Sequence, residues 1–204
     1  NFADFNLFKE KKKNIDYNEI SKEMRLIYHG TIASRFDLVN ILKGINLLKG
    51  KIKIKFNIYG KGDGVSDLIK VIKKLELENN VIYHGEIPLD QVPKKILESH
   101  LGIVSYVNST ATSMMFPLKL MEYVAMQLPV LTVKNKPIKY YFKETKLAYY
   151  KSESPKSFSI ELLKLFENPT ILTKMQSDMI DFNAKYNWDK EKNKYLKIIN
   201  DINI

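Results

Sequence analysis

Lys119 and Glu122 stand three residues apart in an otherwise apolar stretch, FPLKLMEYVAMQLPVLTV, which covers residues 116–133. That spacing places both side chains on one face of a helix. Lys119 falls in the first turn, where free N–H groups and the helix dipole favour a bound phosphate. Glu122, one turn deeper, has the reach to accept hydrogen bonds from two adjacent ribose hydroxyls. Two interpretations follow: a ligand-binding pair, or an i,i+3 ion pair on a solvated helix face.

Three glycines indicate where a ligand could approach the backbone. Gly30, Gly60 and Gly85 each end a short apolar run, in the segments HGTIASRFD, YGKGDG and HGEIPLD. Glycine permits a sharp turn and a close approach of ligand to main chain. Three glycines at successive strand ends predict one shared ligand site.

The elements that must position these residues alternate along the chain. Short apolar strands separated by helices of about 10–15 residues predict β-α-β units with parallel strands. We therefore expect an α/β, doubly wound, about six-stranded and mostly parallel Rossmann-like sheet with helices on both faces. Ligands bind such sheets beyond the carboxyl ends of the strands, where the glycines lie. The expected strands are residues 25–30, 52–60, 80–85, 101–106, 130–133 and 147–150, and the expected helices are residues 37–49, 65–77, 89–99, 117–126, 157–167, 169–182 and 188–202.

Composition and short motifs exclude several kinds of site. The 204 residues include no cysteine, which excludes disulfide scaffolds, thiolate zinc sites and cysteine nucleophiles. The histidines lack metal-ligand spacing, and we expect strand-end or surface positions for His29, His84 and His100. YGKGDG does not have the G-x-G-x-x-G spacing, and no P-loop sequence occurs, so hydride-transfer and P-loop enzymes are disfavoured.

The charge of the chain favours anionic partners without locating them. The formal net charge is +10, which suits polyanions, phosphorylated ligands or an anionic membrane surface. Lysines are spread along the chain, and the one short basic run, KEKKKN at 9–14, is interpreted as a solvated linker. No apolar run is long enough to span a bilayer. Because the start has neither an initiator Met nor a signal-peptide core, we expect a part of a longer chain.

Together these segments resemble a known family. The strand–Gly and strand–Gly-x-Gly pattern, NVIYHGEIP and FPLKLMEYVAMQLPVL resemble the retaining group 1 glycosyltransferases of the GT-B type, over nearly the whole chain. The resemblance implies the C-terminal, donor-binding half, with the N-terminal acceptor domain absent from these residues. Residues 1–24, polar and irregular, then form an inter-domain linker, 25–186 the Rossmann-like nucleotide-sugar-binding domain, and 187–204 a C-terminal helix that crosses back.

The resemblance also implies roles for individual residues. Glu122 would bind the ribose hydroxyls, and Lys119 with the amides of Leu118 and Lys119 would hold the diphosphate. Arg35 and Lys119 would neutralise the departing diphosphate, which makes them the expected catalytic residues. No metal or other cofactor is expected, because basic groups and the helix dipole take the place of a metal in that family. The other residues expected to bind the nucleotide sugar are Gly30, Thr31, Tyr59, Gly60, Gly85, Glu86 and Ile87.

The chain departs from the family pattern at three places. A second glutamate expected eight residues before Glu122 is Met114, so the groups facing the donor sugar are open. Arg35 is the only clear basic residue of a loop that often carries an Arg and a Lys. Gln127 and Leu128 stand where a Gly usually precedes Pro-Val. The polar candidates for contacting the sugar are Ser109, Thr110, Thr112 and Ser113.

Three functions remain as hypotheses. The first is the donor domain of a hexosyltransferase-type enzyme that builds a bacterial surface polysaccharide or glycolipid, inactive in isolation. Its partners would be a nucleotide diphosphate sugar and a glycan or lipid-linked acceptor. The expected location is the cytoplasm, with peripheral association at the inner membrane face as a further option. The second is a sugar-nucleotide epimerase of related fold. The third is a nucleic-acid-binding module, disfavoured because basic and aromatic residues are not interleaved on one face.

Overall fold

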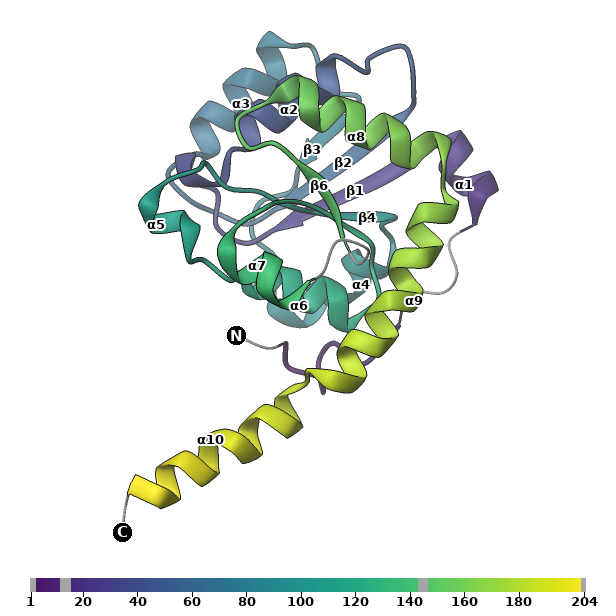
Figure 1. Cartoon of the computed structure of the whole chain (residues 1–204). Coiled ribbons are helices and arrows are strands. Elements are labelled where there is room, and N and C mark those ends of the chain that lie inside the picture. The colour runs from purple at the N-terminus through teal and green to yellow at the C-terminus, as the bar shows by residue number, and fades with distance from the viewer. Residues whose placement is uncertain (1–2, 12–15, 143–146, 203–204) are drawn as a thin grey trace.

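The computed structural model describes residues 3–11, 16–142 and 147–202. Its centre is a parallel sheet of six strands in the order β3-β2-β1-β4-β5-β6 (Figure 1). This confirms the predicted doubly wound α/β fold. The strands are β1 (Met24–His29), β2 (Ile54–Tyr59), β3 (Val81–Tyr83), β4 (Leu101–Val104), β5 (Val130–Val133) and β6 (Ala148–Tyr150).

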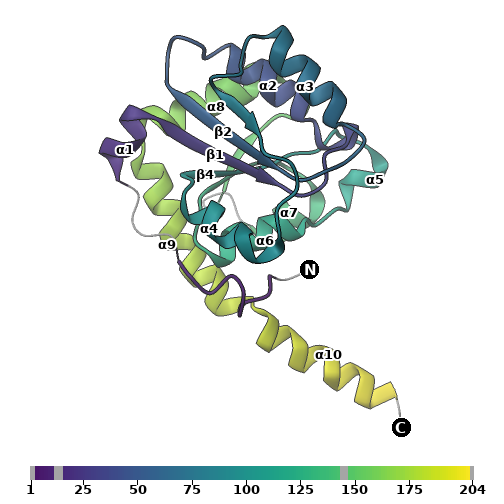
Figure 2. The ribbon, with the colours of Figure 1, turned by 180° about the vertical axis from the view of Figure 1, so that it is seen from behind.

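Helices cover both faces of the sheet. One face carries α2, α3 and α8, and the other carries α4, α6 and α7, with α9 packed on α6 (Figures 1 and 2). The bounds are α1 (Tyr17–Lys22), α2 (Leu38–Asn46), α3 (Val65–Lys74), α4 (Val92–Leu97), α5 (Thr110–Ser113), α6 (Leu118–Ala125), α7 (Lys136–Tyr141), α8 (Pro155–Glu167), α9 (Thr170–Lys185) and α10 (Trp188–Ile202), with 3-10 turns η1 (Ser34–Phe36) and η2 (Leu89–Gln91).

The central strands form the core. β1 is buried from Leu26 to His29, as expected for a parallel strand covered on both faces. Gly102 of β4 lets α6 approach the sheet, because a Cβ there would lie 2.5 Å from the Tyr123 ring. The Tyr123 hydroxyl in turn donates to the Ile27 carbonyl at 3.3 Å. These contacts fix α6 against β1 and β4.

Three short helices were not predicted: α1, α5 and α7. Helix α1 lies in the segment interpreted as irregular, and that interpretation is wrong for residues 17–22. Six residues are too few for a helical period to show, and packing stabilises α1 instead, with Ile20 buried. Ala3 and Phe8 of the same segment are also buried.

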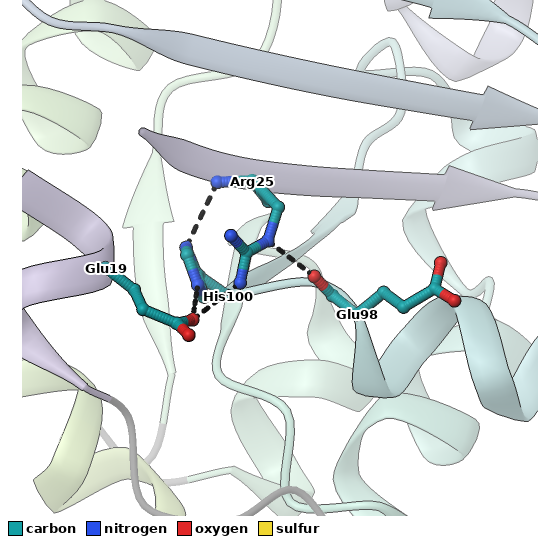
Figure 3. Close-up of polar contacts among 4 residues, drawn as sticks. All are labelled: Glu19, Arg25, Glu98 and His100. Atoms are coloured by element: carbon teal, nitrogen blue, oxygen red, sulfur yellow. Dashed lines mark hydrogen bonds and ion pairs between the residues drawn. The ribbon is translucent and has the colours of Figure 1, made fainter. Parts of the chain in front are cut away.

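A polar cluster joins α1 to the amino ends of β1 and β4 (Figure 3). The Arg25 guanidinium contacts Glu19 at 2.7 Å and donates to the Glu98 carbonyl at 2.7 Å. The Arg25 backbone N–H donates to His100 Nδ1 at 3.1 Å, and His100 Nε2 lies 3.4 Å from Glu19. This cluster lies at the edge of the sheet opposite the glycine loops, so it serves the fold.

Both ends of the domain meet at the carboxyl end of α6. Lys11 Nζ donates to the Ala125 carbonyl at 2.5 Å. From α9, Asn183 donates to the Val124 carbonyl at 2.8 Å and Gln176 to the Gln127 carbonyl at 3.1 Å. Helix α10 then extends away from the body (Figures 1 and 2).

Candidate functional site

The three glycine loops are hydrogen-bonded side by side at the carboxyl edge of the sheet. The Gly30 N–H donates to the Tyr59 carbonyl at 3.0 Å, and the Gly60 N–H donates to the Gly85 carbonyl at 2.7 Å. Gly60 has a φ of 134°, and a Cβ there would lie 1.9 Å from the Gly30 oxygen. Backbone therefore packs directly on backbone, in a way that only glycine allows. The structure brings the three predicted glycines together.

A pocket of about 700 Å³ opens above these loops. Its wall includes six of the predicted binding residues. Tyr59 is buried and stacks on the His84 ring with centroids 4.5 Å apart. The pocket is lined by His29, Gly30, Thr31, Tyr59, Gly60, Lys61, Glu86, Ile87, Pro88, Leu89 and Val92.

Helix α6 begins beside this pocket. Pro117 is its extended N-cap residue, and Leu118 opens the first turn with its side chain 47% exposed. The Leu120 N–H donates to the Pro117 carbonyl at 3.2 Å, which leaves the N–H groups of Leu118 and Lys119 as those that the helix itself does not pair. The following turn carries Glu122 next to Tyr123, whose ring lies on Gly102. The sheet contact of Tyr123 therefore fixes the direction in which Glu122 points.

Lys119 lies against aromatic rings, and among the described residues it forms no ion pair with a carboxylate. Its Nζ is 3.6 Å from the Tyr28 ring centroid and 5.0 Å from that of Phe36. A Cβ on Gly30 would lie 3.5 Å from Nζ, so the ammonium adjoins the first glycine loop. Burial lowers the pKa of Lys119 to about 7, while Glu122 opposes this change. A bound anion would restore the charged form.

Glu122 is buried, with 5% of its surface exposed. The interpretation as an ion pair on a solvated helix face is therefore wrong. Within the described part of the chain its ion-pair contact is with His29, whose Nε2 lies 3.2 Å from Glu122 Oε2. Burial raises the pKa of Glu122 to about 7, and Lys119 opposes this rise. A carboxylate held in so dry a place is typical of a functional site.

His29 is a site residue that the sequence did not identify. It does end a strand, as predicted, but it is buried and lines the pocket. Its ring packs edge-on against Tyr123 with centroids 5.1 Å apart. Burial, and then the nearby Lys119, lower the pKa of His29 to about 3, so the imidazole is neutral. The repeated His-Gly dipeptide at strand ends was the available signal.

Arg35 lies near Lys119, on the Phe36 ring. It is exposed in η1, and its guanidinium lies 4.8 Å from the Phe36 ring centroid. Since Lys119 approaches the same ring, both predicted cations gather around Phe36. Arg35, Lys119 and Glu122 do not themselves line the pocket, and neither do Leu118 and Gly85.

Two further findings concern polar residues near the site. Lys61, which was not predicted, forms a 2.8 Å ion pair with Glu86 between the second and third glycine loops. Three of the four hydroxyls proposed to face a sugar are engaged locally: Ser109 and Thr112 form the capping box of α5, and Ser113 donates to the Thr110 backbone carbonyl. The Met114 side chain is 65% exposed beside them.

Most of the sequence matches the model of a known protein family. The family model described as "Glycosyl transferases group 1" matches residues 9–186. No curated protein matches the sequence.

Solved structures resemble the fold at low sequence identity. A glycosyltransferase from Rickettsia africae matches at a TM-score of 0.81 with 13% identity, over 98% of this chain and 55% of that one. Anabaena Alr3699/HepE, in complex with UDP and glucose, matches at 0.74 with 13% identity, over 98% and 55%. The C-terminal domain of the group 1 protein LpcC from Francisella tularensis matches at 0.70 with 13% identity, over 87% and 96%.

Proposed function

The chain belongs to the glycosyl transferases group 1 family, and from this premise we propose that it binds the nucleotide diphosphate sugar donor of a glycosyltransferase. The observation that carries the proposal is the buried Glu122 carboxylate, held beside a pocket that three glycine-containing strand ends create. The chain spans about half the length of the Rickettsia and Anabaena proteins. The activity of the whole protein is therefore part of the proposal.

In this proposal each part of the donor has its own group of predicted residues. Glu122 accepts hydrogen bonds from the ribose hydroxyls. The diphosphate lies at the start of α6, where Lys119 and the N–H groups of Leu118 and Lys119 meet the first glycine loop. The base occupies the pocket between Tyr59 and the Glu86–Ile87 backbone.

The chemistry that this arrangement supports is departure of a nucleoside diphosphate. As the sugar–phosphate bond breaks, negative charge grows on the leaving diphosphate. Lys119 and Arg35, both placed around Phe36, stabilise that charge together with the amino end of α6. Losing one such preorganised donor raises a barrier by roughly 3–4 kcal/mol.

We propose that the acceptor-binding part of the enzyme is a further domain that these 204 residues do not include. An N-terminal domain supplies the glycan or lipid-linked acceptor, and residues 1–24 and 187–204 connect the two halves. In support, α10 exposes Trp188, Tyr195 and Ile198, a partly apolar surface that another domain can cover. Surface polysaccharide or glycolipid synthesis in the cytoplasm, peripheral to the membrane, is the setting that we propose. Among the described helices, none is long and apolar enough to cross a membrane.

Calorimetric titration of the 204-residue chain tests donor binding. UDP, GDP and ADP are titrated first, followed by the hexose conjugates of whichever binds. A hydrogen bond to a charged group contributes about 1.5–3 kcal/mol, so Glu122→Gln is expected to weaken binding roughly 10- to 150-fold.

A matched carboxylate serves as the control for that titration. Glu78 is exposed, and Glu78→Gln is expected to leave the affinity unchanged. If no nucleoside diphosphate binds, or if the two variants bind equally well, the proposal is wrong.

A further inference from the structure

His29 carries a buried nitrogen that the proposed binding scheme leaves unused. Its side chain is 9% exposed, and its ring lines the pocket next to Gly30. Nε2 has no hydrogen-bond partner among the described residues, although it lies 3.2 Å from Glu122 Oε2. Leaving such an atom unsatisfied in a core destabilises the fold, so the position calls for a functional reason.

The surroundings of His29 fix its charge and its ring orientation. Burial and the neighbouring Lys119 keep the imidazole neutral, with one N–H and one lone pair. Tyr123 packs against the ring edge-on and holds its plane. A neutral ring beside an ionised carboxylate is stable only if the nitrogen facing the carboxylate carries the proton. The opposite tautomer would place a lone pair against Glu122.

We propose that His29 is the positioning residue for Glu122: its Nε2–H donates to Oε2 and leaves Oε1 free for the ribose hydroxyls. The inference rests on the proposed donor binding and adds the group that orients the carboxylate. In this structure the N–H and Oε2 are close but not aligned. The terminal torsion angle of a glutamate side chain varies over a broad range at little cost. A small rotation of the carboxylate can therefore form the hydrogen bond from Nε2–H to Oε2 as a ligand binds Oε1.

Substitution at His29 separates positioning from packing. Glutamine can place an N–H near the Nε2 position, whereas leucine fills space without donating. With the nucleoside diphosphate that the wild type binds best among UDP, GDP and ADP, His29→Leu is expected to weaken binding about 5- to 20-fold, the loss of one hydrogen bond. His29→Gln is expected to stay within about threefold of wild type.

A double-mutant cycle with Glu122→Gln gives the second readout. Because His29 acts through Glu122, His29→Leu should cause no further loss of affinity in that background. Equal losses in His29→Leu and His29→Gln, or independent losses in the cycle, would overturn the inference.

Nitrogen-15 NMR of the histidine rings tests the tautomer without any ligand or substitution at His29. The chain has three histidines, so assignment needs only His84→Gln and His100→Gln. At pH 8, above the pKa of Glu122, His29 is expected as the neutral Nε2–H tautomer. The Nδ1–H tautomer or an imidazolium would refute the positioning role. Failure of every diphosphate to bind would instead refute the proposed function, and the NMR result would still decide the tautomer.

Discussion

Replacing Glu122 by glutamine should stabilise the fold above neutral pH. The carboxyl is 5% exposed, and burial raises its pKa from 4.5 to about 7. Between pH 4.5 and about 7, the Glu122 carboxyl is therefore protonated in the folded chain and ionised in the unfolded chain. Stability therefore falls as pH rises through this window, because the folded state binds more protons.

The size of the effect follows from that difference in pKa. Each pKa unit corresponds to about 1.4 kcal/mol, so ionising Glu122 in the folded state destabilises it by about 3 kcal/mol at pH 8. An amide of the same shape does not ionise. The free energy of unfolding of Glu122→Gln minus that of wild type should rise by about 3 kcal/mol from pH 4.5 to pH 8.

Urea denaturation at half-unit pH steps measures this difference. Titrating groups far from Glu122 cancel, since both proteins share them, and Lys119→Met in both backgrounds removes the charge that lowers the pKa of Glu122. The exposed control Glu78→Gln should show no such trend. A difference between Glu122→Gln and wild type that is flat with pH would refute the reasoning, because a buried carboxyl cannot avoid this linkage.

Two further substitutions test the supporting contacts. Gly60→Ala should destabilise the chain by more than about 2 kcal/mol in urea, since its Cβ would overlap the Gly30 oxygen at a positive φ. Gly50→Ala is the comparison, because the φ of Gly50 is also positive but a Cβ there would meet nothing within 4 Å. An equal loss of stability in both variants would contradict the packing argument. Gly102→Ala should cost about 1–3 kcal/mol and also weaken nucleotide binding by shifting Tyr123 and α6. Unchanged affinity in that variant would show that α6 is positioned by other contacts.

The fold was predictable because its signals are local. Strand-ending glycines and alternating apolar segments predicted all six strands, and the structure confirms the fold class. Helix α1 was missed because tertiary packing of Ile20 and the Glu19–Arg25 pair stabilise it, and neither leaves a periodic signal in six residues. Packing between segments far apart in the chain cannot be predicted from local sequence patterns.

The sequence allowed us to predict which residues of the candidate site share a helix face, but not how deeply they are buried or which groups contact them. The spacing of Lys119 and Glu122 indicated a shared face, but the burial of Glu122 depends on the packing of α6 on β1 and on Gly102 of β4. His29 was interpreted as a generic strand-end residue because the approach of α6 cannot be read from its neighbours in sequence. The hydroxyls of Ser109 and Thr112 looked available, yet a four-residue helix uses them for its own cap. The assignment of ligand roles to all of these residues stays a prediction.

Helix α6 gives the molecule a mechanical property. Its amino end bears the residues proposed to hold the donor, and its other end is tied to Lys11 near the start of the chain and to Asn183 near the end of α9. Eight residues of helix form a stiff rod of roughly 12 Å. A displacement of either connecting segment would therefore be transmitted along α6 to the proposed diphosphate site. If the proposed N-terminal domain moves, its motion and the affinity for the donor should then be coupled through this helix.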